Sequence, residues 1–136
     1  MKILCHRGFW KKKSEQNTLD SFESALIQKF GIEIDIRDFN NEIVISHDAP
    51  NKNSPKLKAL LDIGLHHDLP LAFNIKSDGI TKELAKIIEN FKVSNYFCFD
   101  MSIPQQLSYQ TMGLTWYSRL SDHIEEQVIN KNAQGI

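Results

Sequence analysis

The residues best suited to chemistry are two histidines and two carboxylates in the first third of the chain. His6 and His47 each follow a short apolar run, and Glu33 and Asp35 lie between them in the sequence. Imidazole titrates near neutral pH, so two histidines that flank a carboxylate pair are suited to act as general acid and base. A histidine at a strand end can also be a surface or hydrogen-bonded side chain, and both interpretations stay open here.

The two carboxylates belong to a segment with strict alternation of apolar and charged residues. Ile32, Ile34 and Ile36 point to one face of a strand, and Glu33 and Asp35 point to the other. Two carboxylates that face one interior repel each other unless a cation or an Arg or Lys side chain neutralises them. Hard divalent cations prefer such oxygens, so the pair is a candidate ligand set for Mg²⁺ or Ca²⁺. The alternative is a half-exposed strand with hydrated carboxylates.

Apolar runs and helical patterns alternate along the chain. The predicted strands are 2–5, 32–36, 71–75, 96–99 and 114–117, with a short hairpin strand at 43–46. Helices are expected between them, the first capped by Asn17 or Thr18 and the third by Thr81. Strands and helices that alternate about five times predict an α/β fold with a parallel sheet, either doubly wound or a (β/α) barrel.

A polar residue stands at the carboxyl end of four predicted main strands and of the hairpin strand. These residues are His6, His47, Lys76, Asp100 and Arg119. The carboxyl ends of parallel strands build the sites of α/β sheets and barrels. The sequence therefore predicts a functional site at this edge of the sheet.

Composition indicates one ordinary domain, 1–136, with 16 basic and 17 acidic residues. That balance gives no electrostatic reason to expect nucleic acid as a partner, and no run of about 18 apolar residues predicts a membrane span. Cys5 and Cys98 lie in apolar runs, which fits a reducing compartment, and we expect the cytoplasm. A closed barrel needs roughly 250 residues, so we expect the first five or so βα units of a domain that is incomplete at its carboxyl end.

Several linked motifs resemble the glycerophosphodiester phosphodiesterases in order and spacing. They are His6-Arg7-Gly8, Gln16-Asn17-Thr18, Gly31-Ile32-Glu33-Ile34-Asp35 and His47-Asp48, continued by Asn74-Ile75-Lys76 and more faintly by Arg119. The fold of that family is a TIM barrel related to the phosphatidylinositol-specific phospholipases C. The resemblance therefore favours the barrel over the doubly wound sheet.

The resemblance implies roles for the matched residues. His6 and His47 would be the acid/base pair, and Arg7 would hold the phosphate with its planar guanidinium. Lys76 would add a second positive contact, and Arg119 is the third residue assigned to substrate or phosphate binding. The expected partner is a small-molecule phosphodiester.

The same resemblance implies a divalent cation, Mg²⁺ or Ca²⁺, bound by Glu33, Asp35 and the residue at position 74. This chain departs from the family there, because Asn74 stands where a Glu is usual, and Gln16 also replaces a Glu. Asn74 offers a neutral carbonyl oxygen, which lowers the expected affinity for metal. Asp100 is a candidate to compensate from the next strand end.

The implied function is a metal-dependent phosphoric diester hydrolase of lipid metabolism that acts on glycerophosphodiester-like substrates. The alternative is a non-catalytic remnant of the same fold that binds phosphate or a sugar phosphate. Both histidines are retained, which favours catalysis, whereas Asn74 and Gln16 favour the remnant.

Overall fold

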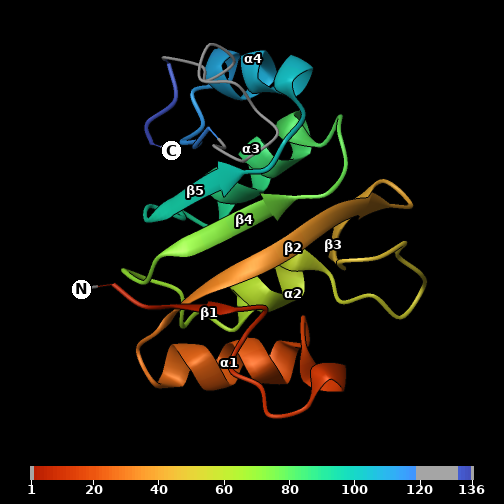
Figure 1. Cartoon of the computed structure of the whole chain (residues 1–136), viewed down its shortest axis with the longest axis vertical. Helices are drawn as coiled ribbons and strands as arrows, with labels where there is room; N and C mark the ends of the chain where they lie inside the picture. The colour runs from red at the N-terminus through yellow and green to blue at the C-terminus, as the bar shows by residue number, and fades with distance from the viewer. Residues whose placement is uncertain (1, 119–131, 136) are drawn as a thin grey trace, which may run out of the picture.

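The chain folds into an open sheet with helices packed behind it (Figure 1). The computed structural model describes residues 2–118 and 132–135. The elements in chain order are β1 (Leu4–His6), the 3₁₀ turn η1 (Lys13–Glu15), α1 (Leu19–Ile27), β2 (Gly31–Phe39), β3 (Glu42–Ile45), α2 (Leu57–Asp62), β4 (Leu71–Ile75), α3 (Thr81–Asn90), β5 (Tyr96–Phe99) and α4 (Ile103–Thr111).

The sheet has the order β1-β2-β4-β5, and these four strands are parallel. The strand β3 returns antiparallel along the carboxyl-terminal half of β2, where Ile36 is the partner of Ile45. This arrangement confirms the predicted parallel sheet of alternating βα units. It also brings the carboxyl ends of the parallel strands to one edge.

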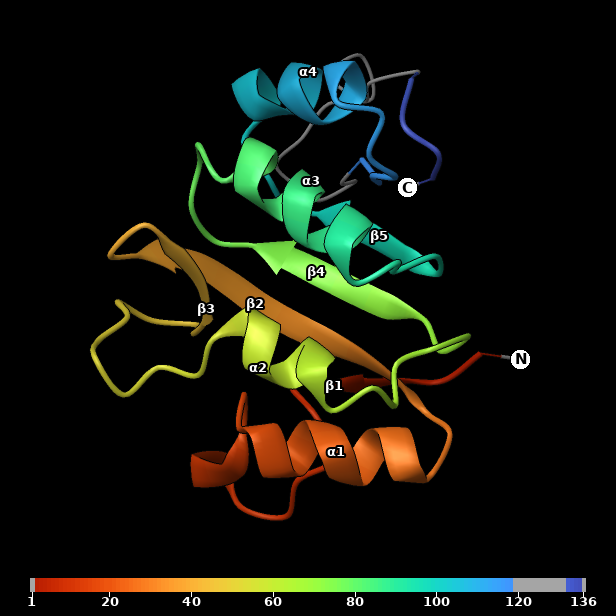
Figure 2. The ribbon, with the colours of Figure 1, turned by 180° about the vertical axis from the view of Figure 1, so that it is seen from behind.

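The two faces of the sheet differ in what covers them. Ile32, Ile34 and Ile36 of β2 are fully buried, as are Leu71 and Phe73 of β4. They pack toward α2 and α3, which lie behind the sheet in Figure 1 and in front of it in Figure 2. Among the described residues, no helix covers the face that looks toward the viewer in Figure 1. Alternation places Glu33 and Asp35 on this face, which none of the described helices covers.

Local details correct or confirm individual predictions. Thr18 caps α1 as predicted, because its Oγ1 accepts a hydrogen bond of 3.3 Å from the backbone N–H of Ser21. The prediction that Thr81 caps α3 is wrong, since Ile80 is the N-cap residue. The predicted strand 114–117 is reduced to one bridge, in which Trp116 pairs parallel with Cys98 of β5.

Residues 134 and 135 lie beside this bridge. The backbone N–H of Gln134 donates to the carbonyl of Trp116 at 3.0 Å, and the N–H of Ser118 donates to the carbonyl of Gly135 at 2.8 Å. Two hydrogen bonds thus hold this segment along the outer side of residues 116–118. None of the described helices is long and apolar enough to cross a membrane.

Candidate active site

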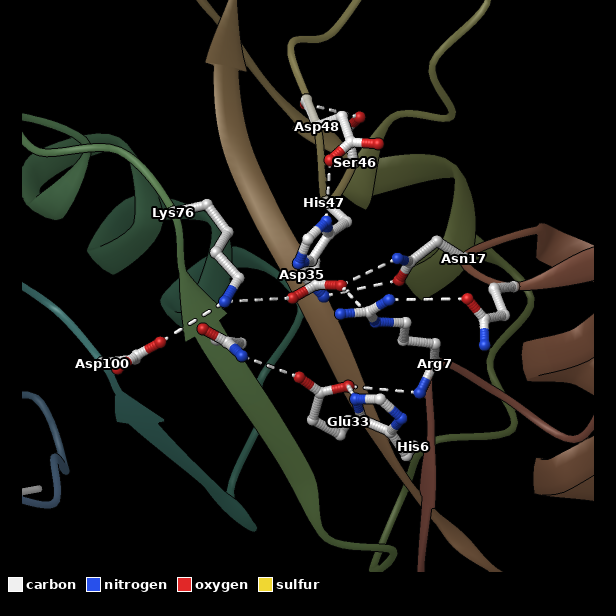
Figure 3. Close-up of polar contacts among 12 residues, drawn as sticks. His6, Arg7, Asn17, Glu33, Asp35, Ser46, His47, Asp48, Lys76 and Asp100 are labelled. Atoms are coloured by element: carbon white, nitrogen blue, oxygen red, sulfur yellow. Dashed lines mark hydrogen bonds and ion pairs between the residues drawn. The ribbon is translucent and has the colours of Figure 1, made fainter. Parts of the chain in front are cut away.

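Five strand-end and strand residues meet in one cluster at the carboxyl edge of the sheet (Figure 3). His6 ends β1, His47 follows β3 and Lys76 follows β4, while Glu33 and Asp35 lie on β2 between them. In the close-up, the imidazoles of His47 and His6 lie on either side of the Arg7 guanidinium. The structure therefore brings together the predicted acid/base pair, the predicted carboxylates and two of the predicted phosphate-binding cations, Arg7 and Lys76.

Asp35 is the electrostatic centre of this cluster, and its side chain is fully buried. Its Oδ2 lies 2.9 Å from Nε of Arg7 and accepts a hydrogen bond of 2.9 Å from Nδ2 of Asn17. Its Oδ1 lies 3.6 Å from Nζ of Lys76. A buried carboxylate is strongly disfavoured without partners of opposite charge. Here two cations from neighbouring strand ends supply that charge.

Glu33 is also nearly buried, and its two oxygens have separate partners. Oε1 accepts a hydrogen bond of 3.0 Å from Nδ2 of Asn74, and Oε2 accepts one of 3.1 Å from the backbone N–H of Arg7. Nε2 of His6 is 3.8 Å from Oε2, within ion-pair range when the imidazole is protonated. Glu33 thus links the end of β1 to the middle of β4.

The turn after β1 fixes the position of Arg7 by an unusual backbone conformation. Arg7 has a φ of 57°, in the left-handed region that L-residues other than Gly, Asn and Asp seldom adopt. Its carbonyl accepts hydrogen bonds from the backbone N–H of Asn17 at 3.0 Å and from Oγ of Ser21 at 3.3 Å. Strained backbone held by its surroundings is concentrated at functional sites in proteins.

Gly8 is required beside this turn. Its φ is 93°, and a Cβ built on it would lie 2.3 Å from Oγ and 2.9 Å from the backbone carbon of Ser21. The helix α1 therefore approaches the His6-Arg7-Gly8 segment so closely that only glycine fits. This contact explains why the third position of the motif is a glycine.

His47 is oriented by its neighbours in the chain and on β2. Its Nδ1 lies 2.8 Å from Oδ1 of Asp48, and Nε and Nη2 of Arg37 donate to its carbonyl at 3.1 and 3.0 Å. The hydrogen bond and charge of His47 hold the pKa of Asp48 below its usual range. In the neutral tautomer that keeps its proton on Nδ1, facing Asp48, the lone pair is on Nε2. His47 is then the better placed of the two histidines to accept a proton.

Lys76 lies between two acidic side chains. Its Nζ is 3.6 Å from Oδ1 of Asp35 and 3.3 Å from Oδ2 of Asp100. About one fifth of its side chain is exposed. Asp100 therefore joins the cluster through Lys76.

The three predicted metal ligands are neighbours, but their donor atoms do not fit a divalent cation. Asp35 and Asn74 are direct partners in the pairing of β2 with β4, and Glu33 is bonded to Asn74. The charge of Asp35 is already matched by Arg7 and Lys76. Asn74 directs its amide nitrogen, not its oxygen, at Glu33. Within the described part of the chain, no group of three or more His, Cys, Asp or Glu residues is placed to hold a metal ion.

Two buried oxygens of this set have no hydrogen-bond donor, Oδ1 of Asp35 and Oδ1 of Asn74. The first faces the ammonium group of Lys76, which leaves a single neutral amide oxygen as the unused ligand. Water can complete the coordination of Mg²⁺ and Ca²⁺, but both ions depend on anionic protein ligands. The one unused oxygen is neutral, so these residues do not fit a divalent cation.

A pocket of about 650 Å³ adjoins Arg7. Its lining includes Lys13, Asn17, Ser46 and Asn51, together with His47. The volume is in the range of small-molecule sites, but the lining is more polar than usual. The pocket therefore suits a ligand with hydroxyl or charged groups.

The structure also identifies site residues to which the sequence analysis gave no role in the site. Asn17 was expected only as a possible helix cap, yet it donates to Asp35, and Arg37 fixes the backbone of His47. The sequence indicated Asn17 by its place in the Gln16-Asn17-Thr18 motif. It indicated Arg37 by its place on the same alternating face as Glu33 and Asp35. Gln16, which departs from the family, accepts a hydrogen bond of 3.4 Å from Nη1 of Arg7. Arg119 lies outside the described residues.

No protein-family model matches the sequence, and no curated protein matches it either. Solved structures do match. A glycerophosphodiester phosphodiesterase from Parabacteroides distasonis is 18% identical with a TM-score of 0.56, over 86% of this chain and 72% of that one. A glycerophosphoryl diester phosphodiesterase from the same organism is 16% identical with a TM-score of 0.65, over 86% of this chain and 53% of that one.

A glycerophosphodiester phosphodiesterase from Thermotoga maritima is 20% identical with a TM-score of 0.63, over 90% of this chain and 64% of that one. The chain thus spans between about half and about three quarters of these three proteins. At such identities the likeness establishes the fold. The chain has the α/β fold of the glycerophosphodiester phosphodiesterases, with a parallel sheet of alternating βα units that matches part of their TIM barrels.

Proposed function

We propose that the protein binds and hydrolyses a phosphodiester at the carboxyl edge of its sheet. The observation that carries this proposal is the placement of two cations, Arg7 and Lys76, beside two histidines, His6 and His47, at one edge. Planar guanidinium and compact ammonium groups are the usual protein partners of phosphate oxygens. The solved structures of similar fold are phosphodiesterases, which supports the same class of substrate.

In the proposed reaction, Arg7 and Lys76 hold the non-bridging oxygens of the phosphodiester. Nε2 of His47 accepts the proton of the attacking hydroxyl, which belongs to water or to the substrate itself; in the second case a cyclic phosphodiester forms, and water opens it in a second step. The new P–O bond forms as the bond to the leaving alcohol breaks, and His6 donates a proton to the departing oxygen. Charge that builds on the equatorial oxygens is stabilised by the two cations.

The pocket beside Arg7 would hold one alcohol group of the substrate. Because it is lined by amide and hydroxyl side chains and by Lys13, a polar group such as glycerol fits it better than an acyl chain. The cation that the sequence resemblance implies is left out of this mechanism, because the two buried carboxylates already have partners within the protein.

Turnover of a glycerophosphodiester tests the proposal. Replacement of His6 or His47 by Ala should each lower kcat by ~10²–10⁴-fold, the usual loss for one proton-transfer group. His67→Ala is the matched control, since His67 is exposed and precedes β4 at the opposite edge. Wild-type protein that binds glycerol phosphate without any turnover would support the non-catalytic remnant instead.

A further inference from the structure

The buried carboxylates of the site have partners within the chain itself. Glu33 and Asp35 are the two buried acidic residues among those that the structure describes. Arg7 and Lys76 each contact Asp35 through one of its two oxygens. A buried negative charge is strongly disfavoured without positive charge nearby. The side chains of Arg7 and Lys76 supply it at Asp35, and hydrogen bonds from Asn74 and from the backbone N–H of Arg7 hold Glu33.

Asn74 supports this arrangement through its amide nitrogen. The hydrogen bond of 3.0 Å from Nδ2 to Glu33 fixes the orientation of the amide, because the reverse orientation would place its oxygen against a carboxylate. Position 74 therefore acts as a donor to Glu33, whereas a carboxylate at this position would repel it. A neutral donor lowers the need for an added cation, while an acid would raise it.

From these contacts we infer that Arg7 and Lys76 take the electrostatic place of a divalent cation, so that the site binds phosphate without one. Nζ of Lys76 faces Oδ1 of Asp35, and the guanidinium group of Arg7 faces Oδ2. The binding of phosphate at this place rests on the proposed function.

The first experiment measures melting temperature in EDTA and in excess Ca²⁺, Mg²⁺ or Mn²⁺. Wild-type protein should melt within about 1 °C of the same temperature in all of them, because a ligand that does not bind cannot shift unfolding. Asn74→Glu should melt lower than wild type in EDTA and recover several degrees in Ca²⁺, since the new carboxylate faces Glu33. Asn74→Gln is the uncharged control for size and should show no recovery.

A second variant keeps the test decisive if Asn74→Glu does not fold. Lys76→Met removes one internal cation from Asp35 and should become stabilised by divalent cations where wild type is not. A wild-type protein whose melting temperature rises with Ca²⁺, with the rise abolished by Asp35→Asn, would overturn the inference. So would a Lys76→Met variant that remains indifferent to every cation.

Calorimetric titration with inorganic phosphate separates this inference from the proposed function. Binding in EDTA that Ca²⁺ leaves unchanged supports both. Binding only when Ca²⁺ is present contradicts the inference and leaves the phosphodiester site in place. Absence of binding in both conditions contradicts the proposed function, while the melting experiment still decides the question of the cation.

Discussion

The ion pair between Arg7 and Asp35 should make a large contribution to stability that a double-mutant cycle can isolate. The two atoms are 2.9 Å apart, Asp35 is fully buried and Arg7 is 19% exposed. With an effective dielectric constant of roughly 20, the attraction at this distance is about 6 kcal/mol. Desolvation of both groups offsets a large part of this. We expect a net coupling energy of about 2–3 kcal/mol.

Asp35→Asn and Arg7→Met are the suitable single changes. Asn at position 35 keeps an oxygen for the hydrogen bond from Asn17 but removes the charge, and Met keeps the apolar stem of Arg7. Each single variant leaves the other charge with fewer partners and should lose about 3 kcal/mol, which corresponds to roughly 10 °C in melting temperature for a chain of this size.

Urea unfolding of the wild type, both single variants and the double variant gives the coupling energy. The surface pair Lys58 and Glu83, 3.3 Å apart and partly exposed, is the control and should couple by less than ~1 kcal/mol. The double variant should be destabilised by clearly less than the sum of the single variants. Additive effects, or a coupling no larger than that of the control pair, would refute the electrostatic account of the site.

Other predictions concern the turn and the opposite edge of the sheet. Gly8→Ala should cost at least about 2 kcal/mol in urea unfolding because its Cβ meets Ser21, whereas Gly79→Ala, with a φ of 85° but open space, should cost only about 1 kcal/mol. Equal costs would show that crowding is unimportant. Burial and the charge of His67 hold the pKa of His66 below its ordinary value of about 6.5. The stability that neutral His66 gives is present above about pH 6.5 and is lost as the pH falls toward the lowered folded pKa. The melting temperature should therefore fall less steeply with acidification in His66→Gln than in wild type. Identical slopes of melting temperature against pH would contradict this.

The order of strands and helices was predictable because it depends on local periodicity. The alternation at 32–36 correctly placed three isoleucines toward the helices and two carboxylates on the opposite face. Thr18 was predictable as a cap because its side chain acts on a neighbour three residues away. The strand predicted at 114–117 has the right composition, but strand pairing depends on distant partners, and only Trp116 forms a bridge.

The charge partners of the site were not predictable from periodicity. Arg or Lys side chains can neutralise facing carboxylates, but the family resemblance favoured a metal. The outcome depends on the left-handed turn at Arg7, which aims its side chain at Asp35. It also depends on the orientation of the Asn74 amide, for which no sequence pattern exists. The role of Arg119, the extent of the domain and the cytoplasmic location stay predictions.

Backbone NMR during a titration with glycerol phosphate in EDTA tests the central claim most directly. If the phosphate lies between Arg7 and Lys76, saturable shifts should occur in the amides after β1, β3 and β4, at residues 7–8, 47–48 and 76–77. The amides at 65–68, at the opposite edge of the sheet, should stay unchanged. Shifts confined to residues outside the carboxyl edge, or no saturable shift at any ligand concentration, would contradict the assignment of a phosphate site to this cluster.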